Sequence, residues 1–264
     1  MTLAIAVQYP YGRFREALES LSKIRPLLRQ EAIIFLTDSR YTYQNHYEDD
    51  GIKLHDIDVS TVIAFSGKVN IAEQCVENIQ RKLNSPGNKI INVQKTFQRT
   101  YRFQKRHNDK TGVKTGILSF LMGKYLKTGE TRLVLLESPD FKAKFVTGIE
   151  GIGDKKAYEE VKKVVVPKLE NISNFNGTEK DYFSMAVIIA DAMRLIAIEN
   201  PRFDKIAGPI QYWVLNRKGI TEHSLSYTED PTGKRDNWHR LTAKRSELKT
   251  AKDKHDLGPD YLMR

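Results

Sequence analysis

The feature that most constrains the fold of this 264-residue chain is the order of its apolar segments. Segments with strand-like alternation come first and are followed by two helical segments, further strands, two more helices and a last strand. Strands are predicted at 2–8, 32–36, 52–57, 59–65, 116–125, 131–136, 141–146 and 210–215, and helices at 70–83, over the basic stretch 95–114, and at 155–165 and 182–199. Strands and helices that come in separate groups pack as separate layers, so the sequence predicts an α+β domain.

Two further segments set the domain boundaries. Residues 9–31 separate the first two strands, and their apolar spacing predicts a helical insertion. Residues 226–264 are polar with nearly balanced charges, which is typical of a helical or disordered C-terminal extension. We therefore expect one domain over 1–225.

Within this domain, the glycine-rich segment 148–153 is interpreted as a strand-to-helix turn, because it lacks the Lys-Ser/Thr of a phosphate-binding loop.

Several classes of protein are excluded by what the chain lacks. Cys75 is the only cysteine, so no intrachain disulfide or cysteine-based metal site is expected. The six histidines show no metal-ligand spacing, and no cofactor motif is present. No apolar run approaches the roughly 20 residues that span a bilayer, and the N-terminus does not resemble a secretory signal. The sequence therefore predicts a cytoplasmic protein that needs neither membrane nor metal.

The formal net charge of +10 is unevenly distributed. Seven Lys or Arg residues lie between Lys95 and Lys114 with a single acid, and the aromatic residues Phe97, Tyr101 and Phe103 alternate with them. Bases and aromatics together can bind single-stranded nucleic acid. A solvated helix face with core aromatics explains the same pattern, and no named nucleic-acid motif is present. Nucleic acid is therefore not the expected partner, although salt-dependent binding remains an alternative to test.

Four early segments carry a more specific pattern. In order they are TLAIAVQ at 2–8, FLTDSRYT at 35–42, IKLHDID at 52–58 and VIAFSG at 62–67. Lys53 follows Asp38 by 15 residues, and Gly67 follows Lys53 by 14. In this order and spacing they resemble the catalytic β-subunits of the proteasome and the related bacterial peptidases, which are N-terminal-nucleophile (Ntn) hydrolases. Residues 117–157 and 181–215 extend the resemblance to roughly 2–220. It implies a four-layer αββα sandwich with two antiparallel sheets between helix layers.

The resemblance assigns roles to individual residues. Thr2 matches the nucleophile once Met1 is removed, and its own α-amine would act as the base. Lys53 matches the lysine that lowers the pKa of that amine, and Asp38 matches the carboxylate that holds the lysine charged. The N–H of Gly67 matches an oxyanion donor, with Ser66 beside it at the substrate.

The match also has supporting positions and departures. Ser39, Arg40 and Asp204 correspond to residues that brace the site in the family. Catalytic members usually carry a serine in the turn before the third helix and another three residues after the supporting aspartate. Here those positions hold Ile152 and Ala207. A site without these hydroxyls transfers protons more slowly or is inactive.

The implied function is a threonine peptidase acting on peptides or unfolded proteins. The family confines such activity in closed assemblies, so we expect a homo-oligomer in rings or stacks, with an ATP-dependent unfoldase as a candidate partner. Three alternatives stay open. The chain is an inactive structural subunit or binding scaffold with the same fold, it is a peptide ligase, or it is an amidohydrolase that uses the same acyl-enzyme.

Overall fold

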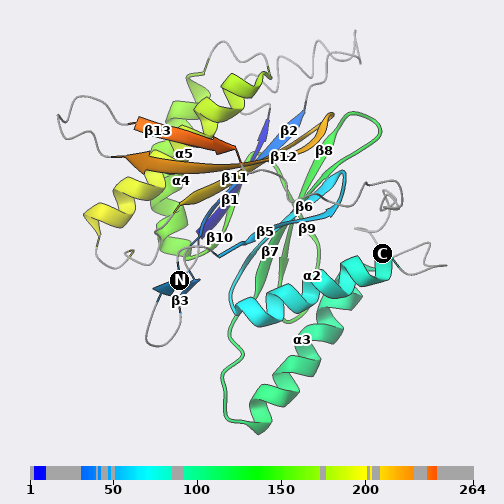
Figure 1. Ribbon diagram of the computed structural model, residues 1–264. Coiled ribbons are helices and arrows are strands. Elements are labelled where there is room, and N and C mark those ends of the chain that lie inside the picture. The colour runs from blue at the N-terminus through cyan, green and yellow to red at the C-terminus, as the bar shows by residue number, and fades with distance from the viewer. Residues whose placement is uncertain are drawn as a thin grey trace.

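The computed structural model is an α+β fold with two large antiparallel sheets and helices packed against them (Figure 1). The structure describes residues 3–9, 31–39, 41–42, 47–48, 51–84, 92–172, 177–200, 203, 209–228 and 237–242. The α+β class predicted from the order of apolar segments is confirmed. Within the described ranges, no helix is both long and apolar enough to cross a lipid bilayer.

The first sheet has six strands in the order β10-β1-β2-β11-β12-β13, with every neighbouring pair antiparallel. The central strands β1 and β2 are buried along their whole length, which agrees with their continuous apolar sequences. The strands are β1 Leu3–Tyr9, β2 Ala32–Asp38, β10 Ile149–Gly153, β11 Ile210–Asn216, β12 Gly219–Thr228 and β13 Asn237–Thr242.

The second sheet has five antiparallel strands in the order β5-β6-β7-β8-β9. Consecutive strands are neighbours throughout, so the sheet is a simple meander. Its strands are β5 Leu54–Asp58, β6 Thr61–Ser66, β7 Ser119–Tyr125, β8 Thr131–Glu137 and β9 Lys144–Val146. A short two-stranded ribbon pairs β3 Tyr41–Thr42 with β4 Tyr47–Glu48.

Four helices lie in the described part of the chain, and their ends follow from local capping. Asp154 accepts hydrogen bonds from two backbone N–H groups at the start of α4, and Thr178 forms a capping box with Asp181 at the start of α5. Asn92 caps α3 through the N–H of Lys95. The helices are α2 Val69–Leu83, α3 Val93–Lys110, α4 Lys155–Glu170 and α5 Glu179–Glu199.

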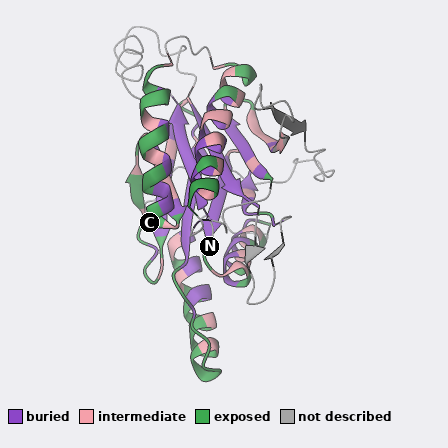
Figure 2. Cartoon of the chain, turned by 90° about the vertical axis from the view of Figure 1, so that its left-hand side faces the viewer, coloured by how far each residue is buried: buried purple, intermediate pink, exposed green. Residues whose placement is uncertain are grey.

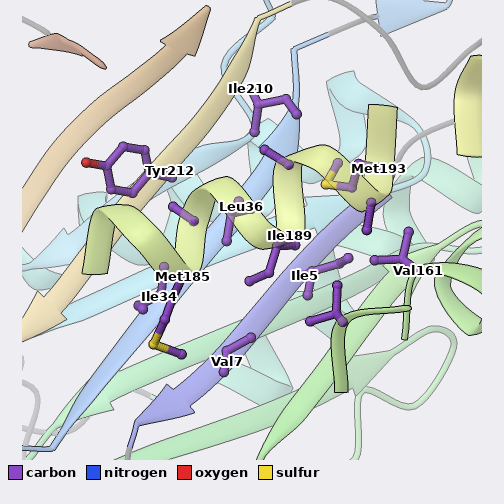
Figure 3. Close-up of a cluster of buried hydrophobic side chains, with 14 of the residues drawn as sticks. Ile5, Val7, Ile34, Leu36, Val161, Met185, Ile189, Met193, Ile210 and Tyr212 are labelled. Carbon is purple, nitrogen blue, oxygen red and sulfur yellow. The ribbon is translucent and has the colours of Figure 1, made fainter. Parts of the chain in front are cut away.

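Two core clusters join each helix pair to one sheet. In the first, α4 and α5 pack on the outer face of the first sheet (Figure 3). The labelled side chains there come from β1, β2, α4, α5 and β11, and they are Ile5, Val7, Ile34, Leu36, Val161, Met185, Ile189, Met193, Ile210 and Tyr212. In the second cluster, α2 and α3 cover the second sheet in the same way, with Phe97 against Phe120 at 4.3 Å between ring centroids.

A third cluster lies between the two sheets. It contains the opposite faces of β1 and β2, including Ala4 and Phe35, together with Leu121 of β7. Gly123 marks a close approach, because a Cβ there would lie 2.6 Å from Cζ of Phe35 and 2.8 Å from Cδ1 of Ile33. The sheets therefore meet face to face, and the helices lie on their outer faces. The strands are largely buried, whereas the helices also carry intermediate and exposed residues (Figure 2).

Several sequence predictions need correction, including the strand predicted at 141–146, which begins only at Lys144, and the helix predicted over 95–114, which ends at Lys110. Residues 149–153 are not a turn but strand β10, which pairs with β1 from Leu3↔Gly153 to Val7↔Ile149. The extension predicted at 226–264 contains ordered strand, because β13 pairs with β12 at the edge of the sheet. The strand predicted at 116–125 begins only at Ser119. Of the predicted insertion 9–31, Tyr9 ends β1 and Glu31 precedes β2, whereas residues 10–30 lie outside the described residues.

Candidate active site

The carboxylate of Asp38 joins three parts of the chain at the end of β2. Its Oδ1 accepts a hydrogen bond of 2.8 Å from the backbone N–H of Leu3, the first residue of β1. Its Oδ2 accepts a bond of 2.7 Å from Nζ of Lys53, which directly precedes β5 of the other sheet. One side chain therefore fixes the start of the chain's first strand against a lysine from the second sheet.

The Asp38–Lys53 pair is withdrawn from solvent. The side chain of Lys53 is 0% exposed and that of Asp38 is 1% exposed. Burial raises the pKa of the Asp38 carboxyl above its ordinary value, while the Lys53 ammonium and the Leu3 N–H act in the opposite direction. A charge buried at this position is strongly unfavourable without an opposite charge beside it, so Asp38 and Lys53 stabilise each other.

The end of β6 lies beside Lys53. The backbone N–H of Phe65 donates to the carbonyl oxygen of Lys53 at 3.3 Å, one residue before the buried Ser66. Gly67 follows with a φ of +117°, a conformation that L side chains rarely adopt. A Cβ on Gly67 would also collide with the backbone oxygen of Ile117. Gly67 is exposed, and among the described residues its N–H donates no hydrogen bond, which leaves it available to a ligand.

A backbone frame holds Lys53 and Asp38 in register. The side chain of Gln211, on β11, donates to the carbonyl of Gly51 at 2.9 Å and accepts from the N–H of Lys53 at 3.4 Å. Ser39 is buried, and its carbonyl accepts from the N–H of Gly51 at 2.8 Å. Ser39 thus contributes backbone contacts beside the pair. The role of Gln211 was missed by the sequence analysis, since a lone glutamine in a strand gives no signal.

Ile152 lies in β10 rather than in a turn. It pairs with Ala4 of β1, and its side chain is 4% exposed within the cluster between the sheets. Position 152, which the resemblance aligned with a serine, is therefore an apolar core position. Ile152 brings no polar atom to the start of β1.

Four positions named in the sequence analysis lie outside the described residues: Thr2, Arg40, Asp204 and Ala207. The structure thus brings together Asp38, Lys53 and the start of β1, with Ser66 and Gly67 at the neighbouring strand end. In the part of the chain that is described, no cluster of His, Cys, Asp and Glu has the arrangement of a metal site.

Known protein families and curated proteins offer no relative with which this geometry can be compared. A scan against models of protein families and a search of curated proteins both find no match to this chain.

A second buried ion pair provides an internal comparison. Lys124 on β7 and Asp58 on β5 lie 3.7 Å apart, and their side chains are 3% and 1% exposed. Asp58 also accepts from the N–H and hydroxyl of Ser60. This pair connects β5 and β7 of one sheet, on either side of β6, rather than the two sheets. Burial and pairing alone therefore do not mark a site, and the distinguishing feature of Asp38 is its bond to the N–H of Leu3.

Proposed function

We propose that the chain is a proteasome-like threonine peptidase with an Ntn-hydrolase fold of four αββα layers. In this proposal Thr2 becomes the N-terminal residue after removal of Met1 and attacks peptide bonds. The single observation that carries the proposal is the Asp38 carboxylate, which binds both the N–H of Leu3 and the ammonium of Lys53. Leu3 directly follows Thr2, so the residue next to the proposed nucleophile is hydrogen-bonded to the buried Asp38–Lys53 pair.

The proposed reaction uses the α-amine and hydroxyl of Thr2, the Asp38–Lys53 pair and the N–H of Gly67. An α-amine has an ordinary pKa of about 7.7–8.0, so part of it is neutral near pH 7 and can accept the hydroxyl proton of Thr2. A buried cation nearby lowers the pKa of the amine and enlarges that neutral fraction. Lys53 supplies the cation, and Asp38 keeps it charged and oriented. The N–H of Gly67 then stabilises the oxyanion of the tetrahedral intermediate, an interaction worth roughly 3 kcal/mol in other enzymes.

The layered fold supports the proposal without identifying the reaction. Both antiparallel sheets, the outer helices and the order of elements agree with an Ntn-hydrolase sandwich. The expected substrates are peptides or unfolded chains. The expected state is a homo-oligomer in a ring or stack, because an open peptidase would degrade cellular proteins. An ATP-dependent unfoldase is the proposed partner class, and the cytoplasm the proposed location.

One observation favours an inactive scaffold as the second candidate. Ile152 places an apolar side chain in the strand next to the start of β1, where catalytic members carry a hydroxyl. Without that hydroxyl, a proton leaving the nucleophile has one acceptor fewer. In the scaffold reading, the Asp38–Lys53 pair serves only to join the two sheets.

Hydrolysis of fluorogenic peptides by the purified oligomer tests the proposal. Thr2→Ala is expected to lower the rate by on the order of 10⁴-fold or more, because the nucleophile is lost. Thr2→Ser should retain measurable activity, since its hydroxyl and α-amine remain. Thr111→Ala, at an exposed threonine after α3, is the matched control and should behave like the unmodified protein. Equal hydrolysis by Thr2→Ala would refute the proposal.

A further inference from the structure

The C-terminal half of α3 projects beyond the rest of the molecule (Figures 1 and 2). Its first half is anchored in the core by Phe97 and Tyr101, which are 0% and 7% exposed. From residue 102 onward, nearly every side chain up to residue 117 is exposed or partly exposed, Thr115 excepted. This part of the helix and the loop after it are therefore accessible to a partner.

One face of α3 carries a row of five bases. Residues spaced by three and four lie on the same helix face, and this row, which we call the basic stripe, consists of Lys95, Arg99, Arg102, Arg106 and Lys110. All five are exposed. At a rise of 1.5 Å per residue, the stripe is about 22 Å long. That length matches several consecutive phosphates of an extended nucleic-acid strand.

No acid of the described residues is paired with the basic stripe. In the described ranges, none of its five side chains forms an ion pair or a side-chain hydrogen bond, whereas the neighbouring Lys105 is paired with Asp109 at 2.7 Å. The positive charge of the stripe acts on Lys82 of α2. The pKa of Lys82 is lowered, first by burial and then by the charge of Arg99. Glu77 of α2 lines the groove beside Arg99, but the bases of the stripe outnumber it, so this face keeps an excess of positive charge that favours a polyanion.

Phe103 distinguishes this face from an ordinary solvated helix. Core packing explains Phe97 and Tyr101 of the basic stretch but not Phe103, whose side chain is 71% exposed. Phe103 lies four residues after Arg99 and three before Arg106, so its ring borders the basic stripe. It also lines a groove of about 370 Å³ between α2 and α3, together with Arg81 and Arg99. An exposed ring beside arginines is a platform on which an unpaired base can stack.

We propose that the basic stripe and Phe103 bind single-stranded nucleic acid, with phosphates along the stripe and a base stacked on Phe103. A second copy of the chain fits this face poorly, because a two-fold contact would place five cations against five cations. A duplex would use the cations but not the ring, since its bases are already stacked. This proposal is independent of the proposed peptidase activity.

Fluorescence anisotropy with labelled dT20 and rU20 tests the proposal on the full-length protein. If four or five phosphates are neutralised, the slope of log K against log salt is about −3, and affinity falls about 60-fold between 50 and 200 mM salt. The triple variant Arg99→Gln, Arg102→Gln, Arg106→Gln should reduce the magnitude of that slope by about 2. Glutamine is a good helix former, so these exposed changes preserve α3.

The control variant removes equal charge from another face. It carries Lys155→Gln, Lys156→Gln and Lys168→Gln on α4, and its slope should equal that of the unmodified protein. An equal loss in this control would overturn the proposal, because binding would then follow net charge alone. Absence of salt-dependent binding, or an unchanged slope in the arginine variant, would overturn it as well.

Phe103→Ala separates single strands from other polyanions. Loss of one stacked base is expected to weaken dT20 binding about 5- to 150-fold, with duplex binding unchanged. An equal loss on a 20-base-pair duplex, or tighter binding of poly-glutamate than of dT20, would overturn the assignment to single strands. The second result would identify the face as a surface for acidic proteins.

Discussion

Replacement of Lys53 by Met is expected to lower peptide hydrolysis by about 10²–10⁴-fold, the range over which general acid–base catalysis contributes. The ammonium of Lys53 is 2.7 Å from Asp38, whose other oxygen holds the N–H of Leu3. In the proposed mechanism, removing this cation raises the pKa of the α-amine of Thr2, so less of the amine is neutral and able to accept a proton. The rate deficit should therefore shrink as pH rises through the pKa of the amine.

Lys124→Met is the matched control for this variant. Lys124 is also a buried lysine paired with an aspartate, but that pair lies within the second sheet. Both variants lose a buried cation and are expected to lose stability, yet only Lys53→Met should lose activity per folded molecule. Initial rates are measured at equal concentrations of folded protein, as judged by circular dichroism. If the two variants lose activity equally, Lys53 has only a structural role.

The second large effect concerns stability. Asp38→Leu or Lys53→Met alone is expected to lower the free energy of unfolding by about 3–5 kcal/mol, because each removes one member of a fully buried ion pair. The double variant should recover part of that loss, since it leaves no orphaned charge, whereas the N–H of Leu3 still loses its acceptor. Urea unfolding followed by circular dichroism gives the four free energies of this cycle.

The pair Asp58 and Lys124 provides the comparison cycle. Their separation of 3.7 Å, against 2.7 Å for Asp38 and Lys53, predicts a smaller coupling energy. Additive losses in the cycle of Asp38 and Lys53 would contradict the strong pairing that the proposed site requires. The activity of the double variant is expected to stay low even where its stability recovers.

The sequence was most informative where one physical signal controlled the outcome. The continuous apolar run at 59–65 identified β6, which is buried along its whole length. Helical spacing identified α2 and α5, because each buries one side against a sheet. The meeting of Asp38 and Lys53 was predicted only through the family resemblance, since a spacing of 15 residues does not by itself place two side chains in contact.

Other features were hidden because the residue pattern has more than one physical explanation. The glycines of 148–153 suggested a turn, yet Gly151 lies in β10, where the close packing of the Tyr158 ring from α4 leaves no room for a Cβ. The segment 237–242 suggested a polar tail, yet an edge strand needs no continuous apolar run. Phe103 suggested a core aromatic, because sequence spacing does not reveal that α3 extends past the sheet that it covers.

The most direct test of the proposed function is the intact mass of the purified protein before and after exposure to an electrophile that reacts with N-terminal threonine. A live nucleophile predicts a chain without Met1 that gains one adduct, and neither Thr2→Ala nor Lys53→Met should gain it at a comparable rate. A chain that retains Met1 and gains no adduct would contradict the peptidase proposal. The layered fold and the Asp38–Lys53 pair would then belong to a scaffold.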